Sequence, residues 1–419
     1  MKFPEINIII GANYGDEGKG LVTNALAKDK NTLVILTNGG SQRGHTVVQD
    51  GIRHVFHHFG SGTLKSARTY CADTFIVNPI TFMEEFYTLK NFERKRVDYS
   101  KNPLETAFLS NVSISENCRI TTIYDMLANK IRCLLSGKND STGYGIWETI
   151  QRYEANPAFF KYGEFVKKGG VLVAAEMHRI RDYYLAKFAD LLKETPDDNS
   201  ELRICLDLYL NPNLEANFYT DLDGMIDNTN LITKDKEYDW VIYYNRWIFE
   251  QGQGLAINLT DKEFGTPSYT DSTLPIQFLQ EMFKENFDSL VIKRYYVTRS
   301  YLTRHGDGAF SADKEFGKKF DDKTNVYNEY QGSIKYAPFD RGSWMSMLTR
   351  IFKDYYKNSI KINNEKNDGE FNLVITHLNE QDVPYNEFNH TGVVNINFTK
   401  IFGSFDETEI KELYNKVDA

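Results

Sequence analysis

The sequence predicts an α/β fold, with one mostly parallel central sheet, a P-loop-like nucleotide site, helices on both faces, and hairpin and helical insertions. Two observations predict this class. Apolar strand-like runs alternate along the chain with helical patterns, and several of those runs end in glycine or polar residues. Strands that alternate with helices form parallel sheets, whose ligands bind beyond the carboxyl ends of the strands. We therefore expect one ligand site at one end of one sheet.

The first element is an apolar strand at residues 5–10, followed by the glycine-rich turn GANYGDEGKG at 11–20 and a helix from about 18 to 28. This order places backbone N–H groups and a helix N-terminus where an anion can settle, and Lys19 adds a positive charge. The P-loop pattern is not met, because Gly20 stands where that pattern has a magnesium-binding hydroxyl. A generic P-loop phosphotransferase is therefore disfavoured.

Two acids, Asp16 and Glu17, lie inside this anion-attracting turn, which makes sense if one of them meets a metal ion or takes a proton. A second apolar strand at 32–37 leads into another glycine-rich loop, 38–46, which carries His45. Taken singly, Asp16 could be a helix N-terminal acid and His45 could cap a turn. Together with the lysine they form a set suited to phosphoryl transfer.

The remaining elements follow from the same periodicities. Asp50-Gly51 lies between two alternating runs and predicts a hairpin. In chain order we expect helices at 79–95 and 122–135, helical patterns across 147–200 that break at Gly169-Gly170, strand character from 238 into the glycine-bearing QGQG at 251–254, a strand or strand pair running into Gly306 and Gly308, and a strand within 370–379. We expect a single domain over 1–419, with approximate sub-regions 1–78, 79–237 and 238–419.

Composition narrows the function classes. The chain has 419 residues, 41% of them hydrophobic and 26% charged, which indicates a globular protein. A formal net charge of −9 argues against nucleic acid as a partner. The four cysteines form no CxxC pair, so we interpret them as reduced thiols. No apolar run approaches about 18 residues, so we expect no membrane association and a soluble, cytoplasmic protein.

Five ordered segments carry a family resemblance: GDEGKG at 15–20, GGSQRGHT at 39–46, STGYGI at 141–146, EQGQG at 250–254 and YLTRHGDGAF at 301–310. In this order they resemble the adenylosuccinate synthetase family. The resemblance implies a carbon–nitrogen ligase that joins L-aspartate to C6 of a 6-oxopurine nucleotide, with IMP as first choice. It also implies a 6-phosphoryl intermediate, made with a nucleoside triphosphate.

The same resemblance implies roles for individual residues. Asp16 is expected to take the proton from purine N1, His45 to donate to O6, and Lys19 to neutralise the transferred phosphoryl group. Mg²⁺ is expected on Asp16 and the Gly44 carbonyl. The remaining donor-site residues are expected to be Gly15, Gly18, Gly20, Thr46, His377 and Asn379.

For the acceptor nucleotide the resemblance implies Gln42, Thr142, Gln253 and Thr270. Arg152 falls where the family supplies an arginine from a neighbouring subunit, which would make the working unit a homodimer; the alternative is a solvated helix face. For the amino acid, Lys335 and Arg341 are the candidates. Arg304, in the segment similar to the family's Thr-Arg-x-Gly, is expected to be a further substrate-binding residue.

Two departures from the family pattern leave alternatives open. Asn379 stands where the family has an aspartate that selects guanine in GTP, so ATP or dATP becomes a credible donor beside GTP. The amino-acid loop, 328–344, has fewer arginines than the family, although aspartate stays the first choice. Its KYAPFD segment is similar to phage 2-aminoadenylosuccinate synthetases, which act on dGMP with an adenine nucleotide. Those enzymes tend to replace the base with a small residue, whereas Asp16 is retained here. The alternatives are therefore a ligase for GMP or dGMP with ATP or dATP, and an inactive purine-nucleotide-binding regulatory protein.

Overall fold

The computed structural model describes residues 3–96, 112–137, 141–195, 200–211, 213–257, 271–306, 320, 322–358, 360–362, 365–367, 369–380, 400–404 and 410–414. Strands from both ends of the chain enter one ten-stranded sheet in the order β18-β17-β16-β11-β1-β10-β2-β5-β7-β9. Every pairing in this sheet is parallel except that of β17 with β18. The predicted fold class is confirmed, while the single domain stays a prediction.

The strands of the sheet are β1 Glu5–Gly11, β2 Thr32–Leu36, β5 Arg68–Cys71, β7 Val112–Ser115, β9 Asn230–Ile232, β10 Arg246–Gly254, β11 Ile292–Arg299, β16 Glu370–Thr376, β17 Lys400–Ser404 and β18 Ile410–Tyr414. Four two-stranded pairs accompany it: β3 His45–Gln49 with β4 Ile52–Phe56, β6 Ile76–Val77 with β8 Arg119–Ile120, β12 Leu302–Arg304 with β13 Lys335–Ala337, and β14 Ile360–Ile362 with β15 Glu365–Asn367. The β3–β4 hairpin turns at Asp50 and Gly51, whose φ angles are 52° and 76°, as the Asp-Gly signal predicts.

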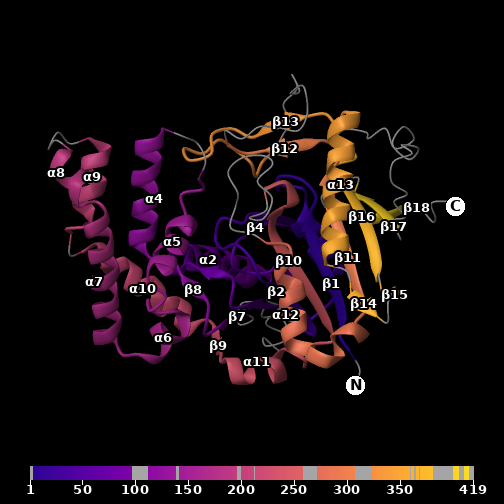
Figure 1. Cartoon of the computed structure of the whole chain (residues 1–419), viewed down its shortest axis with the longest axis horizontal. Helices are drawn as coiled ribbons and strands as arrows, with labels where there is room; N and C mark the ends of the chain where they lie inside the picture. The colour runs from indigo at the N-terminus through magenta and orange to yellow at the C-terminus, as the bar shows by residue number, and fades with distance from the viewer. Residues whose placement is uncertain are drawn as a thin grey trace.

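Alternate residues of the central strands face two different cores. In β1, Ile8 and Ile10 pack into one apolar cluster while Ile9 packs into the other, and β2 divides its residues in the same way. Parallel sheets bury both faces because helices cover each side. The first cluster contains residues of α12 Leu274–Phe283 and α13 Arg341–Lys357, and the second contains residues of α1 Lys19–Leu26 and α2 Pro79–Arg96. In Figure 1, α12 and α13 cross the front of the sheet.

A helical part of the molecule lies to one side of the sheet (Figure 1). It consists of α4 Ile123–Ser136, α5 Ile146–Ala155, α6 Tyr162–Lys167, α7 Gly170–Lys187, α8 Ala189–Glu194, α9 Glu201–Leu208 and α10 Leu214–Asp227. The break predicted at Gly169-Gly170 is the start of α7. No helix in the described part of the chain combines the length and the apolar character that crossing a membrane requires.

The strand expected from residue 238 is wrong in its first part. Helix α11, Lys234–Val241, occupies that position, and β10 begins only at Arg246. The aromatic run favours a strand, but Thr233 precedes the helix and Asp235 and Glu237 lie in its first turn, where acids favour helix formation. QGQG is likewise part of β10 rather than a loop after it.

Candidate active site

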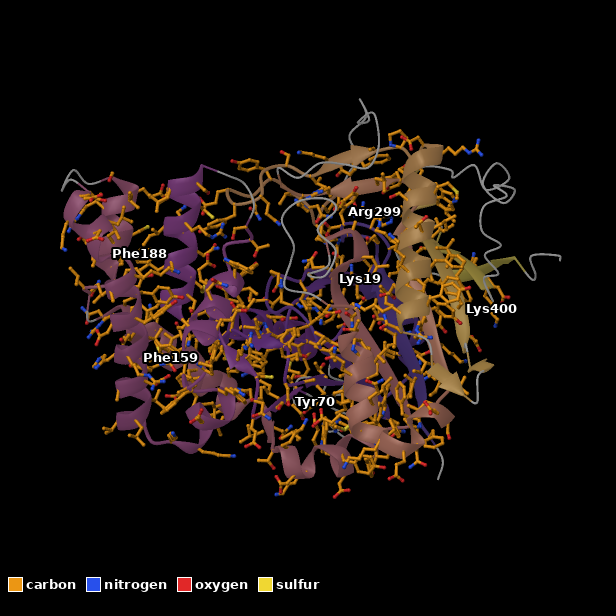
Figure 2. The ribbon with its side chains drawn as sticks, in the orientation of Figure 1. Lys19, Tyr70, Phe159, Phe188, Arg299 and Lys400 are labelled. Carbon is orange, nitrogen blue, oxygen red and sulfur yellow. The ribbon has the colours of Figure 1, made fainter. Side chains whose placement is uncertain are left out.

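A pocket lies beyond the carboxyl ends of β1, β11 and β16, where ligands of parallel sheets bind. It encloses about 850 Å³, counting the solvent at its mouth, which is enough for a nucleotide. Figure 2 shows Lys19 and Arg299 toward the same end of the sheet, away from Tyr70. The predicted residues that line the pocket are Asp16, Gly18, Lys19, Gly20, Gly44, His45, Thr46, His377 and Asn379.

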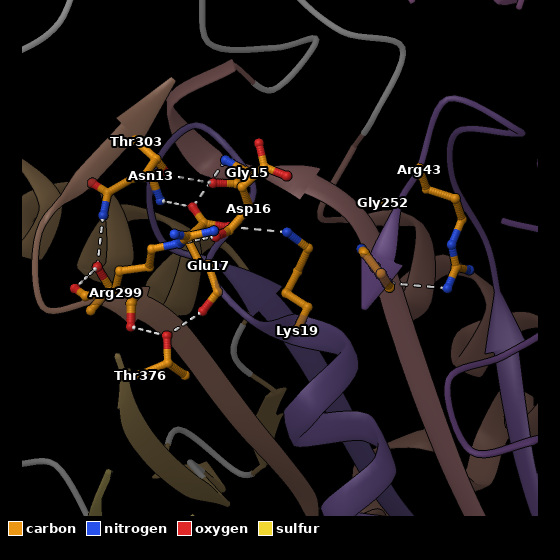
Figure 3. Close-up of polar contacts among 12 residues, drawn as sticks. Asn13, Gly15, Asp16, Glu17, Lys19, Arg43, Gly252, Arg299, Thr303 and Thr376 are labelled. Carbon is orange, nitrogen blue, oxygen red and sulfur yellow. Dashed lines mark hydrogen bonds and ion pairs between the residues drawn. The ribbon is translucent and has the colours of Figure 1, made fainter. Parts of the chain in front are cut away.

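Glu17 holds the first glycine-rich turn in shape. Its Oε1 accepts hydrogen bonds from the backbone N–H groups of Asn13 at 2.8 Å and Gly15 at 3.1 Å. Its Oε2 lies 3.0 Å from Lys19 Nζ, and both side chains are buried. Figure 3 shows this carboxylate turned back against its own loop. Of the two adjacent acids, Asp16 is therefore the one placed for chemistry.

The start of α1 has the features expected of an anion site. Gly18, at φ 93°, precedes the helix, and no side chain caps its first N–H groups. A Cβ on Gly18 would lie 3.0 Å from Thr376 Cγ2, so a larger residue does not fit without a shift. Thr376 Oγ1 also donates to the Glu17 carbonyl at 2.7 Å, which ties the turn to the end of β16. Open N–H groups beside a lysine are typical of a phosphate site.

His45 is held by a buried carboxylate on β10. Glu250 Oε1 lies 2.6 Å from His45 Nδ1, and Glu250 Oε2 lies 2.7 Å from Arg43 Nη2. The backbone N–H and the hydroxyl of Ser61 also donate to this carboxylate. Glu250 is fully buried, so these contacts replace the water that it lacks.

This arrangement defines the protonation of His45. Burial raises the pKa of Glu250, but Arg43 and His45 outweigh it and hold that pKa well below its usual range, so the carboxylate is ionised. The hydrogen of the neutral ring is therefore on Nδ1, facing Glu250. Burial, followed by the charge of Arg43, lowers the pKa of His45 to about 4. Nε2 has no hydrogen-bond partner among the described residues.

Arg299, at the end of β11, is a pocket residue that sequence reasoning missed. Its Nε donates to the backbone carbonyl of Asp16, and its Nη2 lies 3.0 Å from Asp322 Oδ2. Asp16 itself has φ 59°, a left-handed conformation that non-glycine residues rarely adopt. Arg299 therefore helps to hold a strained residue at the predicted position of the base.

The residues predicted to bind the acceptor nucleotide lie near the two glycine-rich loops. A Cβ on Gly15 would lie 3.0 Å from Gln253 Oε1, so Gln253 lies beside the turn that carries Asp16. A Cβ on Gly40 would lie 2.7 Å from Ile146 Cδ1, which brings the second glycine-rich loop against the first residue of α5. Thr142 lies just before that helix and is partly exposed.

Gln42 lies in the second glycine-rich loop, and its Oε1 is buried with no partner among the described residues. Its amide lies next to Gly39. Such an orphaned acceptor fits a ligand group that donates a hydrogen bond. Thr270 lies outside the described residues, as does Gly308.

The amino-acid candidate Lys335 lies beside Arg304, a further predicted substrate-binding residue. Arg304 of β12 pairs directly with Lys335 of β13, so two cationic residues are cross-strand neighbours. Like charges in this position repel, and an anion between them would relieve the repulsion. The Arg304 guanidinium also lies 5.0 Å from the Tyr14 ring. Arg341 is exposed at the first turn of α13.

The position of Arg152 contradicts the alternative reading, a solvated helix face. Its side chain is fully buried, Nε donates to Asp125 Oδ1 at 2.8 Å, and Nη2 donates to the Ile120 carbonyl at 2.8 Å. It therefore lies on no solvated helix face. Its role toward a neighbouring subunit, and the homodimer with it, stays a prediction.

The region expected to bind the donor base follows β16. His377 has φ 62° and its carbonyl accepts from Ser300 Oγ at 3.0 Å. Burial, and secondarily the charge of Arg299, holds the pKa of His377 well below its usual value. Asn379 is exposed and lines the pocket, as does Glu380. An amide therefore stands where the family has a carboxylate, and a neutral imidazole lies two residues before it.

The candidate metal-ligand atoms suit Mg²⁺ better than a metal that is held by several side chains. The described residues contain no cluster of three or more His, Cys, Asp or Glu side chains suited to a metal. Asp16 and Gly44, which line the pocket, offer a carboxylate and a carbonyl oxygen. Mg²⁺ is typically held by one or two carboxylates, with water and substrate phosphates as its other ligands.

Glu250 and Arg43 are residues around His45 to which no sequence pattern assigns a role. Both lie inside motifs quoted for the resemblance, but nothing in their spacing indicates that they meet around His45. Buried charged residues at a strand end next to a candidate histidine would be the signal to look for.

The comparisons with known proteins agree with this geometry. The model of the adenylosuccinate synthetase family matches residues 8–334. The adenylosuccinate synthetase of Clostridium novyi is 24% identical over 350 residues, which cover 81% of this chain and 72% of that protein.

Two solved structures share the fold. The fully ligated adenylosuccinate synthetase of Plasmodium falciparum matches with a TM-score of 0.54 at 16% identity, covering 90% of this chain and 77% of that one. The succinoaminodeoxyadenylate synthetase of cyanophage S-2L, solved with dGMP and with dATP as energy donor, matches with a TM-score of 0.57 at 12% identity, covering 98% and 95%. The chain therefore belongs to the adenylosuccinate synthetase family of carbon–nitrogen ligases, as a divergent member.

Proposed function

We propose that this protein joins L-aspartate to C6 of a 6-oxopurine nucleotide, with IMP as the first choice, through a 6-phosphoryl intermediate. The observation that carries the proposal is that Asp16, Lys19 and His45, which come from different elements, line one pocket. An acid without a nearby histidine or lysine would suffice for binding but not for phosphoryl transfer.

In the first step, the Asp16 carboxylate accepts the proton of purine N1, which moves negative charge onto O6. O6 then attacks the γ-phosphorus of the triphosphate, and the bond to the leaving nucleoside diphosphate breaks. Lys19 neutralises charge on the phosphoryl group, and bound Mg²⁺ would add the same kind of stabilisation at the triphosphate.

His45 serves the oxygen that receives the phosphate. Its Nδ1–H is committed to Glu250, so Nε2 donates only when the ring is cationic. An anionic phosphoryl group beside Nε2 favours that cation, and ionised Glu250 stabilises it from the other side. In the second step, the amine of aspartate forms the C6–N bond, the C6–O bond breaks, and the departing phosphate takes up the proton that the amine loses.

The donor proposal rests on Asn379. An amide both donates and accepts hydrogen bonds, so it lacks the purely accepting character that selects guanine. ATP or dATP is therefore proposed as a donor beside GTP.

A second candidate is a ligase for GMP or dGMP that uses ATP or dATP. The similarity over 98% of this chain to the cyanophage enzyme solved with dGMP and dATP supports it. The retained Asp16 favours IMP, because a small residue in its place would leave more room for a guanine 2-amino group. An inactive regulatory protein is disfavoured, since the Glu250–His45–Arg43 arrangement would serve no purpose in simple binding.

The test incubates the protein with aspartate, Mg²⁺, each of IMP, GMP and dGMP, and each of GTP, ATP and dATP. Phosphate release gives the rate, and mass spectrometry identifies the succinyl product. Asp16→Asn serves as the control, which should bind nucleotide normally and lose phosphate release. Absence of turnover with every 6-oxopurine would exclude both ligase candidates.

A further inference from the structure

His305 lies at contact distance from the proposed base. It directly follows β12, and its imidazole Nε2 lies 3.6 Å from Asp16 Oδ2 and 3.1 Å from Asn325 Oδ1. The side chain is mostly buried, with 15% exposed. The mechanism above gives this histidine no role.

The orientation of Asn325 identifies the tautomer of His305. Asn325 Nδ2 donates to Asp322 Oδ2 at 2.8 Å, so its oxygen must be the atom that faces the imidazole. Nε2 of His305 therefore faces two acceptors, the amide oxygen and the Asp16 carboxylate, and carries the hydrogen. Nδ1 has no partner among the described residues.

Asp16 is consequently held at two points by one connected network. Arg299 binds the Asp16 backbone carbonyl and also Asp322. Asp322 in turn orients Asn325, which positions His305 against the Asp16 carboxylate. Because Asp16 has a strained backbone, its side chain needs such support to keep one orientation.

We propose that His305 is a positioning residue for Asp16: its Nε2–H holds Oδ2 of the carboxylate and leaves Oδ1 to meet the purine N1 proton. This inference rests on the proposed function. The 3.6 Å separation is longer than a hydrogen bond, and such catalytic contacts commonly shorten when substrate binds. The role requires an N–H donor at this position.

Turnover of three variants tests the inference. His305→Leu removes the donor and is expected to lower kcat on the order of 10- to 100-fold with little change in the KM of the triphosphate, because misplacing a catalytic group costs about this much. His305→Gln keeps an N–H donor and should recover most of kcat. His178→Leu, on the exposed face of α7, is the matched control and should behave as the parent. A Leu variant within twofold of the parent, or a Gln variant as slow as the Leu variant, would overturn the proposal.

A second measurement does not depend on turnover. In protein with ¹⁵N-labelled histidine, the His305 signals should report a hydrogen on Nε2. Asp16→Asn and Asn325→Ala should each shift those signals, while Glu176→Gln, on α7, should not. Unshifted signals in Asp16→Asn would overturn the proposal even if the parent proved inactive with every acceptor, an outcome that would by itself refute only the proposed function.

Discussion

Replacement of Glu250 by Gln tests how the protein holds His45. The carboxylate lies 2.6 Å from His45 Nδ1 and 2.7 Å from Arg43 Nη2, and it is fully buried. A charge-assisted hydrogen bond contributes about 1.5–3 kcal/mol, and each 1.4 kcal/mol corresponds to about tenfold in rate. If the full contribution is realised when O6 is phosphorylated, turnover should fall about 10- to 150-fold. The direction is fixed, since losing the anion disfavours the cationic ring that donates from Nε2.

The same change should destabilise the fold, because it leaves the Arg43 guanidinium buried beside a neutral amide. Breaking a buried ion pair costs about 3–5 kcal/mol, and the retained amide hydrogen bonds should keep the loss near the lower value. Phosphate release at saturating substrates gives turnover, and urea unfolding gives stability. The matched control is Glu176→Gln, since Glu176 is a buried carboxylate that binds the Phe160 N–H and Arg179 away from the pocket. A Glu250→Gln enzyme that is less stable but turns over within twofold of the parent would refute the reasoning.

Three further predictions concern the turn, the fold and the donor. Gly18→Ala should lower the free energy of unfolding by about 1–3 kcal/mol and weaken nucleotide binding, because φ at this position is 93° and the new Cβ would meet Thr376. An unchanged midpoint of urea unfolding together with an unchanged nucleotide affinity would contradict this. Burial lowers the pKa of His58 from 6.5 to about 3, and its Nε2 accepts from the Asn78 N–H, so the folded state holds it neutral. The stability that this histidine contributes is complete above about pH 6.5 and should fall as the pH drops toward 3, by about 5 kcal/mol at most. His58→Gln keeps an acceptor, and its unfolding free energy should depend less on pH over that range. Asn379→Asp should raise the ratio of kcat/KM for GTP over ATP by about tenfold, since an ionised acceptor matches guanine; an unchanged ratio would show that the donor base binds elsewhere.

The sequence predicted those parts of the molecule that depend on local patterns. Strand–glycine–helix order gave the carboxyl-end site, and Asp50-Gly51 gave its hairpin. The region from residue 238 was predicted wrongly because aromatic residues favour strands, whereas the helix there depends on acids in its first turn and on the packing of Val241. Arg152 was misplaced because its partner, Asp125, lies on another helix, and no spacing rule links the two. Glu250 and His305 share that property, since each meets its active-site partner only after distant strands come together.

The two adjacent acids of the first turn show how one backbone conformation divides their roles. The left-handed conformation of Asp16 turns the chain so that the next side chain, Glu17, folds under the loop and caps the N–H groups of Asn13 and Gly15. Glu17 also keeps Lys19 paired in a buried position, where an isolated ammonium would be costly. Two backbone hydrogen bonds anchor Glu17. Lys19 could therefore bind phosphate oxygens while it keeps its contact with the Glu17 carboxylate. The turn thus keeps a cation beside the start of α1, while Asp16, supported from outside by Arg299 and His305, keeps its carboxylate available for the proton transfer that we propose.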